Sequence, residues 1–129
     1  MRIEKVCNLI FCYIGDVSLK NGHINDYGFE LYEELLKGDV GTLFTGFTTV
    51  CDYDMTDIEG MFRIDKDEYI PEYQELTSMA HEYDTNIIMQ LVHIGSYTFG
   101  EPKTVYAASV VENPVSKVIP VEISKEGIK

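Results

Sequence analysis

The chain has 129 residues, and its 22 acidic and 10 basic side chains give it a net charge of −12 at pH 7. Its length predicts one domain, and its 45% of hydrophobic residues exclude wholesale disorder. Its negative charge and its content of only two arginines exclude nucleic acid and anionic membranes as expected partners. No apolar run approaches the length of a transmembrane helix, and three cysteines without metal-ligand spacing predict reduced thiols, no metal site and a cytoplasmic protein.

The chain begins with a predicted strand, a helix and a second strand. The apolar run at residues 9–14 predicts the first strand. Residues 26–37 carry an apolar stripe opposite a set of glutamates and predict a helix, with Asp26 as its N-cap and Gly38 as its C-terminal stop. The run at residues 40–45 is nearly continuous rather than alternating, which is typical of a strand buried on both faces of a parallel sheet.

A second helix and a third strand follow. Apolar residues recur at spacings of three and four from residue 68 or 69 to residue 83, where Pro71 fits the first turn of a helix. The apolar run at residues 86–91 predicts the third strand, again buried on both faces. Residues 92–129 contain several glycines and prolines and predict a long loop with one hairpin, a kind of segment that often belongs to an active site.

The order strand, helix, strand, helix, strand predicts an α/β fold whose parallel strands are joined by right-handed crossovers. Three strands and two helices leave two strand edges open, which natural proteins avoid. We therefore expect that the tail covers an edge, that chains associate, or that the chain is part of something larger.

The third predicted strand carries the most specific motif. Met89, Gln90 and the five residues after them read M-Q-L-V-H-I-G, which closely resembles the Q-L-x-H-x-G segment of the NADH:flavin oxidoreductase or old yellow enzyme family. Other segments resemble family motifs in the same order and at matching spacings, and the resemblance extends from about residue 8 to residue 128. These segments are residues 22–26, 32–41, 43–46, 107–109 and 112–116.

The resemblance implies the fold of an FMN-binding (β/α)₈ TIM barrel, which typically needs about 250 residues. The chain would be a single partial TIM-barrel domain over residues 1–129, with about the first three βα units and residues 92–129 as the excursion after strand three. In the family, hydride passes from NAD(P)H to FMN and then to an activated alkene. The resemblance therefore implies FMN as cofactor, NAD(P)H as reductant and a small molecule as substrate.

Two residues match flavin contacts at the carboxyl-terminal mouth of the barrel. Gln90 matches the glutamine that hydrogen-bonds the flavin pyrimidine edge, to which an amide offers one acceptor and two donors. Gly46 matches a glycine beside the flavin, where a side chain would block close backbone approach, and Thr45 would line the same rim. From the residues alone, Gln90 is as readily a core glutamine bonded to neighbouring backbone, and Gly46 an ordinary strand-ending glycine.

The end of the first predicted strand departs from the family pattern. Gly15 and Asp16 stand where relatives carry Met and then Thr or Cys against the flavin, so the resemblance places these two residues at the cofactor as well. A carboxylate at Asp16 would repel an electron-rich reduced flavin. His93, which follows the third strand, would be a polar group at the cofactor rim or a histidine that orders its own loop, and we favour the second.

Two classes of function stay open. The family's substrate-binding, proton-donating and phosphate-binding residues lie later in the barrel, so we assign no catalytic residue and expect the isolated chain to be incomplete for catalysis. In the first class, the chain contributes flavin contacts to a reductase completed by a complementary barrel half. In the second, it is a non-catalytic barrel remnant or an assembly module that binds no flavin and forms a homo-oligomer through its open edges.

Overall fold

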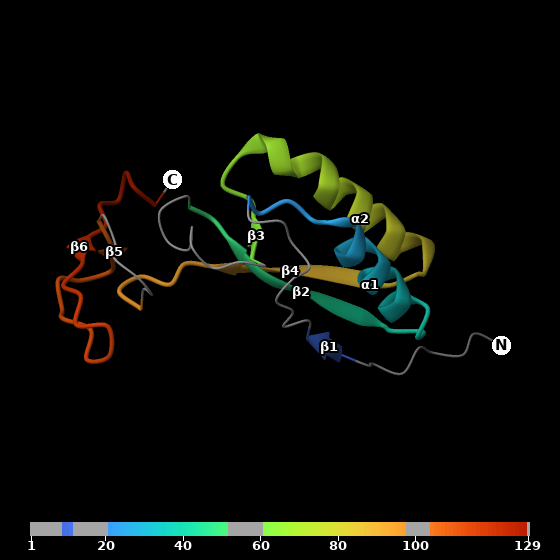
Figure 1. The fold of residues 1–129 in the computed structure, drawn as a ribbon, viewed down its shortest axis with the longest axis horizontal. Coiled ribbons are helices and arrows are strands. Elements are labelled where there is room, and N and C mark those ends of the chain that lie inside the picture. The colour runs from blue at the N-terminus through green and yellow to red at the C-terminus, as the bar shows by residue number, and fades with distance from the viewer. Residues whose placement is uncertain (1–8, 12–20, 52–60, 98–103, 129) are drawn as a thin grey trace.

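The computed structural model describes residues 9–11, 21–51, 61–97 and 104–128 (Figure 1). In these residues a parallel sheet is covered on one face by two helices, and a smaller two-stranded sheet lies beyond the carboxyl ends of the longest strands. The elements in chain order are β1 (Leu9–Phe11), α1 (Asp26–Leu36), β2 (Thr42–Thr49), β3 (Phe62–Arg63), the 3₁₀ helix η1 (Asp67–Tyr69), α2 (Ile70–Glu82), β4 (Asn86–Val92), β5 (Tyr106–Ala107) and β6 (Val121–Glu122).

Strand β2 lies at the centre of the larger sheet. β4 pairs with one edge of β2 along its whole length, and β1 pairs with the first part of the other edge. The short strand β3 pairs with the last two residues of β2, on the same edge as β1. Each pairing is parallel, and α1 and α2 lie within the crossovers, so the predicted α/β fold with parallel strands is confirmed.

The core lies between the sheet and the helices. Tyr32 and Leu36 of α1 and Leu76 of α2 are at most 1% exposed and belong to one buried cluster with Leu43 of β2. Burying a side chain of this size stabilises the fold by about 1.5–3 kcal/mol relative to leaving it exposed. The spacing of apolar residues along both helices therefore predicts the packed face correctly.

The ends of α1 differ from the prediction. Asn25, not Asp26, is the N-cap: its backbone is extended, and its side-chain oxygen accepts a hydrogen bond from the Gly28 amide at 2.7 Å. Asp26 is already the first helical residue, where its negative charge interacts favourably with the positive end of the helix dipole and stabilises the helix. The left-handed residue after the helix is Asp39, with φ of 58°, rather than Gly38.

The strands also correct the sequence interpretation. β2 extends to Thr49 instead of ending at residue 45. β4 is not buried on both faces: Ile88 is 43% exposed, because no described element covers the sheet face opposite the helices, and Leu91, near the end of the strand, is 59% exposed. In the tail, β5 and β6 pair in parallel, and a parallel pair cannot be the predicted hairpin. Within the described residues, no helix is long and apolar enough to cross a membrane.

Candidate functional site

A β-bulge in β2 brings together three of the predicted site residues. The pairing of β2 with β4 shifts by one residue between Phe44 and Phe47, so Thr45 and Gly46 together oppose the single residue Met89. A bulge of this kind raises the local twist and changes the direction in which the neighbouring residues point. Because Phe47 pairs with Gln90, the bulge immediately precedes Gln90 in the ladder.

Two buried threonines hold the bulge. The Thr45 hydroxyl accepts a hydrogen bond from the Gln90 backbone amide at 3.0 Å and donates one to the Gly46 carbonyl at 2.9 Å. The Thr48 hydroxyl also donates to the Gly46 carbonyl, at 3.3 Å. Thr45 is 2% exposed and Thr48 is fully buried. The structure thus places the Thr45 side chain inside the protein, where it links the two strands.

A tyrosine of α1 completes the support of the bulge. The Gly46 amide donates a hydrogen bond to the Tyr32 hydroxyl at 3.0 Å, and Tyr32 is fully buried. A buried tyrosine hydroxyl needs a polar partner, and here the partner is a backbone group that the bulge withdraws from the strand ladder. From the sequence, Tyr32 is expected only within the apolar stripe of the first helix and at the start of the family-like segment 32–41, although a hydroxyl within such a stripe is a signal of a specific buried contact.

Gln90 lies on the uncovered face of the sheet. Ile87 and Met89 pack against the core beneath the helices, and side chains alternate along a strand, so Ile88 and Gln90 lie on the opposite face. The Gln90 side chain is partly exposed, and its amide makes no hydrogen bond within the described residues. The backbone of Gln90 is therefore fixed by Thr45 while its amide group remains available to another molecule.

Two other predicted site residues, Gly15 and Asp16, lie outside the described residues. His93 is described, and its ring atom Nδ1 accepts a hydrogen bond from the Gly95 amide at 3.1 Å. This bond fixes the turn that follows β4. His93 therefore orders its own loop, as we favoured from the sequence, and it also lines a cavity.

That cavity has a volume of about 700 Å³ and lies at the carboxyl ends of β2 and β4. Open parallel sheets bind their ligands at this edge. One wall is formed by residues that directly follow the two strands, and the opposite wall by residues of the small β5–β6 sheet and the turn after it. The lining residues are Val50, Cys51, His93, Ile94, Gly95, Ala107, Ala108, Ile123, Gly127 and Ile128.

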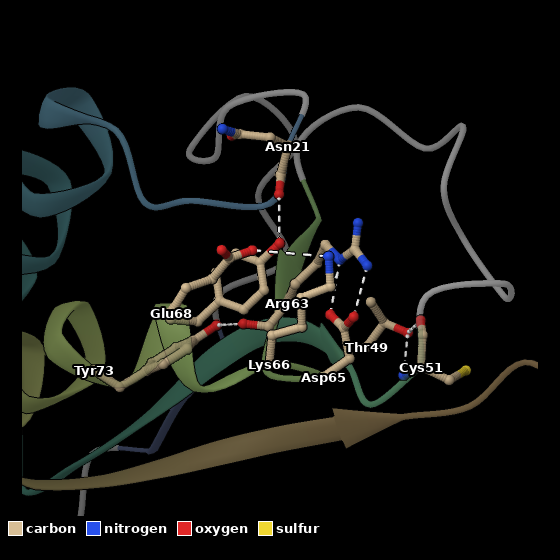
Figure 2. A network of polar contacts seen from close by, with 9 residues as sticks. Asn21, Thr49, Cys51, Arg63, Asp65, Lys66, Glu68 and Tyr73 are labelled. Carbon is tan, nitrogen blue, oxygen red and sulfur yellow. Dashed lines mark hydrogen bonds and ion pairs between the residues drawn. The ribbon is translucent and has the colours of Figure 1, made fainter.

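A polar network fixes the segment between β3 and α2 beside the same edge (Figure 2). The Arg63 guanidinium donates two hydrogen bonds to the Asp65 carboxylate, at 2.7 and 2.8 Å, and this contact lowers the pKa of Asp65. The Tyr73 hydroxyl donates to the Arg63 carbonyl at 2.8 Å, and burial raises the pKa of that tyrosine. The Tyr69 hydroxyl donates to the Asn21 carbonyl at 2.9 Å. Arg63 is thus already bound to a carboxylate of its own chain.

Comparisons by sequence and by structure give different results. No family model and no curated protein matches the chain. Among solved structures, 2-naphthoyl-CoA reductase in complex with 2-naphthoyl-CoA matches with a TM-score of 0.76 and 15% identity, and Old Yellow Enzyme from a Pichia species with 0.74 and 18%. An old yellow enzyme homologue from Zymomonas mobilis matches with a TM-score of 0.72 and 13% identity.

Each of these matches covers 93% of the present chain, but the chain spans only 20%, 34% and 36% of the three matched chains. At such low identity the likeness establishes the fold. The described strands form an open sheet and not a closed barrel. The chain therefore has the fold of one part of the old yellow enzyme TIM barrel.

Proposed function

We propose that the chain supplies the first three strands, and part of the cofactor site, of an FMN-dependent reductase of the old yellow enzyme type. The observation that carries this proposal is the bulge, which places Gly46 directly before the residue that pairs with Gln90 and leaves the Gln90 amide on the uncovered sheet face. When bound, FMN would supply hydride transfer from NAD(P)H to an activated alkene.

The residues at the bulge fit the polar edge of a flavin. The Gln90 amide has one acceptor oxygen and two donor hydrogens, which suits an edge of alternating carbonyl and N–H groups. Its backbone position is fixed by the Thr45 hydroxyl, so only the side-chain torsions of Gln90 have to be ordered when the amide binds a cofactor. Gly46 adds no side chain at the same level of the sheet. In this proposal Gln90 binds and orients the cofactor, and Thr45 positions Gln90.

Arg63, the arginine among the described residues, does not fit the phosphate end of FMN. A phosphate needs cationic or backbone N–H donors, and Arg63 is held by Asp65 at 2.7 Å. Phosphate sites of TIM barrels usually follow strands seven and eight. The proposal therefore includes a partner, which is a complementary barrel half that contributes the later strands and the phosphate contacts.

The uncovered sheet face supports such a partner. Phe47 and Ile88 are 37% and 43% exposed on a sheet whose other face is tightly packed. In a closed TIM barrel this face is filled by layers of side chains from alternate strands. The same exposed face also supports the second candidate function, an assembly module that forms a homo-oligomer and binds no flavin.

An absorbance titration with FMN, combined with size-exclusion chromatography and light scattering, separates the two candidates. The first predicts that the chain perturbs the visible flavin bands and that Gln90→Ala weakens binding about tenfold, the loss expected for one or two hydrogen bonds. Gln74, exposed on α2, provides the matched control Gln74→Ala. If the chain is colourless, does not bind FMN and elutes as a defined oligomer, the result contradicts the first candidate function and supports the second.

A further inference from the structure

The cavity beyond the strand ends is separate from the bulge. His93 follows Gln90 by three residues, which is about 10 Å along an extended strand. On its other side the cavity is lined by Ala107 of β5 and by Ala108, Ile123, Gly127 and Ile128, and none of these residues pairs with the bulge in the β2–β4 ladder. What the cavity can bind is therefore independent of whether a flavin binds near Gln90.

The described residues that line the cavity include no charged side chain, although the whole chain has 32 charged residues and a net charge of −12. Eight of the ten lining residues are aliphatic residues or glycines, and the polar side-chain atoms among them belong to His93 and Cys51. Binding an ion in such a site would require it to lose water without a countercharge. The lining therefore favours an uncharged ligand.

A hydrogen bond within the cavity wall also fixes the tautomer of its polar side chain, His93. The Gly95 amide donates to Nδ1 of His93, so a neutral His93 ring carries its proton on Nε2. Gly95 has a left-handed backbone with φ of 57°, and a Cβ atom there would lie 3.7 Å from the Cβ atom of Ala107. This turn sets the loop after β4 against β5, so the cavity wall is a packed structure rather than a loose loop.

We propose that this cavity is a binding site for a small, uncharged and predominantly apolar molecule. Its volume of about 700 Å³ lies within the range of small-molecule sites, roughly 300–1,000 Å³, which are mostly apolar with a few polar groups. The site goes beyond the flavin proposal because it uses none of the residues at the bulge.

The direct test is a fluorescence titration of the full chain with aminoanthracene, a neutral apolar dye. Anilinonaphthalene sulfonate, which has a similar aromatic surface and a negative charge, is the matched probe. We expect saturable binding of aminoanthracene at one site and binding of the sulfonate that is at least about tenfold weaker, a difference of ~1.4 kcal/mol. Equal binding of the two dyes, or no saturable binding of the neutral one, would overturn the proposal.

Two variants locate the site. Ala108→Trp places a large side chain on the cavity wall, and Val110→Trp places the same side chain two residues away, at an exposed position outside the lining. With circular dichroism confirming that both fold, Ala108→Trp should reduce aminoanthracene affinity at least about tenfold, and Val110→Trp should leave it unchanged. Equal affinities in the two variants would place the dye elsewhere and contradict the assignment.

Cys51 gives a second readout that needs no mutation of the wall. In a Cys7→Ser, Cys12→Ser background, Cys51 is the remaining thiol, and it lines the cavity. Aminoanthracene at saturation should slow alkylation of Cys51 by a small maleimide several-fold, whereas the sulfonate dye at the same concentration should not. An alkylation rate that aminoanthracene leaves unchanged would overturn the proposal even if a tryptophan variant failed to fold.

Discussion

The two faces of the larger sheet are built in different ways. The face beneath α1 and α2 is closed by apolar side chains that are almost fully buried, and its polar atoms are hydrogen-bonded. The opposite face exposes Phe47, Ile88 and the Gln90 amide. The closed face provides the stability of the chain, while the uncovered face holds the groups that can contact another molecule. The bulge connects them, because Tyr32 and Thr45 act from the closed side on residues that define the uncovered side.

The difference between the two faces of the sheet is tested most strongly by truncating one side chain on each face. Leu76→Ala removes a side chain that is 1% exposed beneath the helices, and it should destabilise the chain by about 2–5 kcal/mol. Ile88→Ala on the uncovered face should cost less than about 1 kcal/mol, because Ile88 is already 43% exposed. Urea unfolding of both variants gives the two values. Similar losses would show that the uncovered face is packed in solution.

The connection between the faces is tested by Tyr32→Phe. The variant keeps the buried ring but leaves the Gly46 amide without its partner, which should cost about 1–3 kcal/mol. Tyr83→Phe is the matched control, since the Tyr83 hydroxyl makes a long 3.3 Å contact with Glu33 at the surface, and it should cost less than about 1 kcal/mol.

Amide hydrogen exchange shows whether the effect of Tyr32→Phe is local. The Gly46 and Gln90 amides should exchange faster relative to the helix amides in this variant, because both depend on the bulge. Unchanged relative protection of Gly46 and Gln90 would mean that the tyrosine contributes packing alone.

The smallest expected effect concerns the polar network of Figure 2. Arg63 holds the pKa of Asp65 below its usual range, so this carboxylate contributes stability above the unfolded pKa of about 3.9 and loses it as the pH falls through the lower folded value. Asp65→Asn should therefore reduce the acid-induced loss of unfolding free energy. Asp67→Asn, at an exposed position, should leave the pH dependence unchanged. The same slope in both variants would contradict the assigned role of the ion pair.

The order of β1, α1, β2, α2 and β4 could be predicted from the sequence because each depends on local periodicity, whereas the two-residue strand β3 was not expected. The wrong predictions depend on contacts between distant residues. Asn25 and Asp26 are adjacent and both are favoured cap residues, so composition alone does not distinguish Asn25 as the cap. The pairing of β5 with β6 joins residues 106 and 121, which no turn signal reveals. The exposure of β4 depends on which elements cover the sheet, and no local pattern contains that information.

The candidate site was accessible from the sequence only in part. The motif around Gln90 and the glycine at residue 46 indicate two residues of one site, and the structure places Gly46 directly before Phe47, the residue that pairs with Gln90. The bulge that joins them could not be predicted, because an extra residue in the ladder is a property of two strands in register. Tyr32 was missed for the same reason: its partner is a backbone amide 14 residues away.

The central claim, that the uncovered face binds a flavin through Gln90, is tested most directly by nuclear magnetic resonance. The ¹⁵N-labelled chain would be titrated with FMN, since amide shifts detect even the weak binding expected of a partial site. The account predicts that the largest shifts occur at Gly46, Phe47 and Gln90, and that Gln90→Ala weakens the binding they report about tenfold while Gln74→Ala leaves it unchanged. Shifts confined to the helix surface, or no saturable shifts at millimolar FMN, would contradict it.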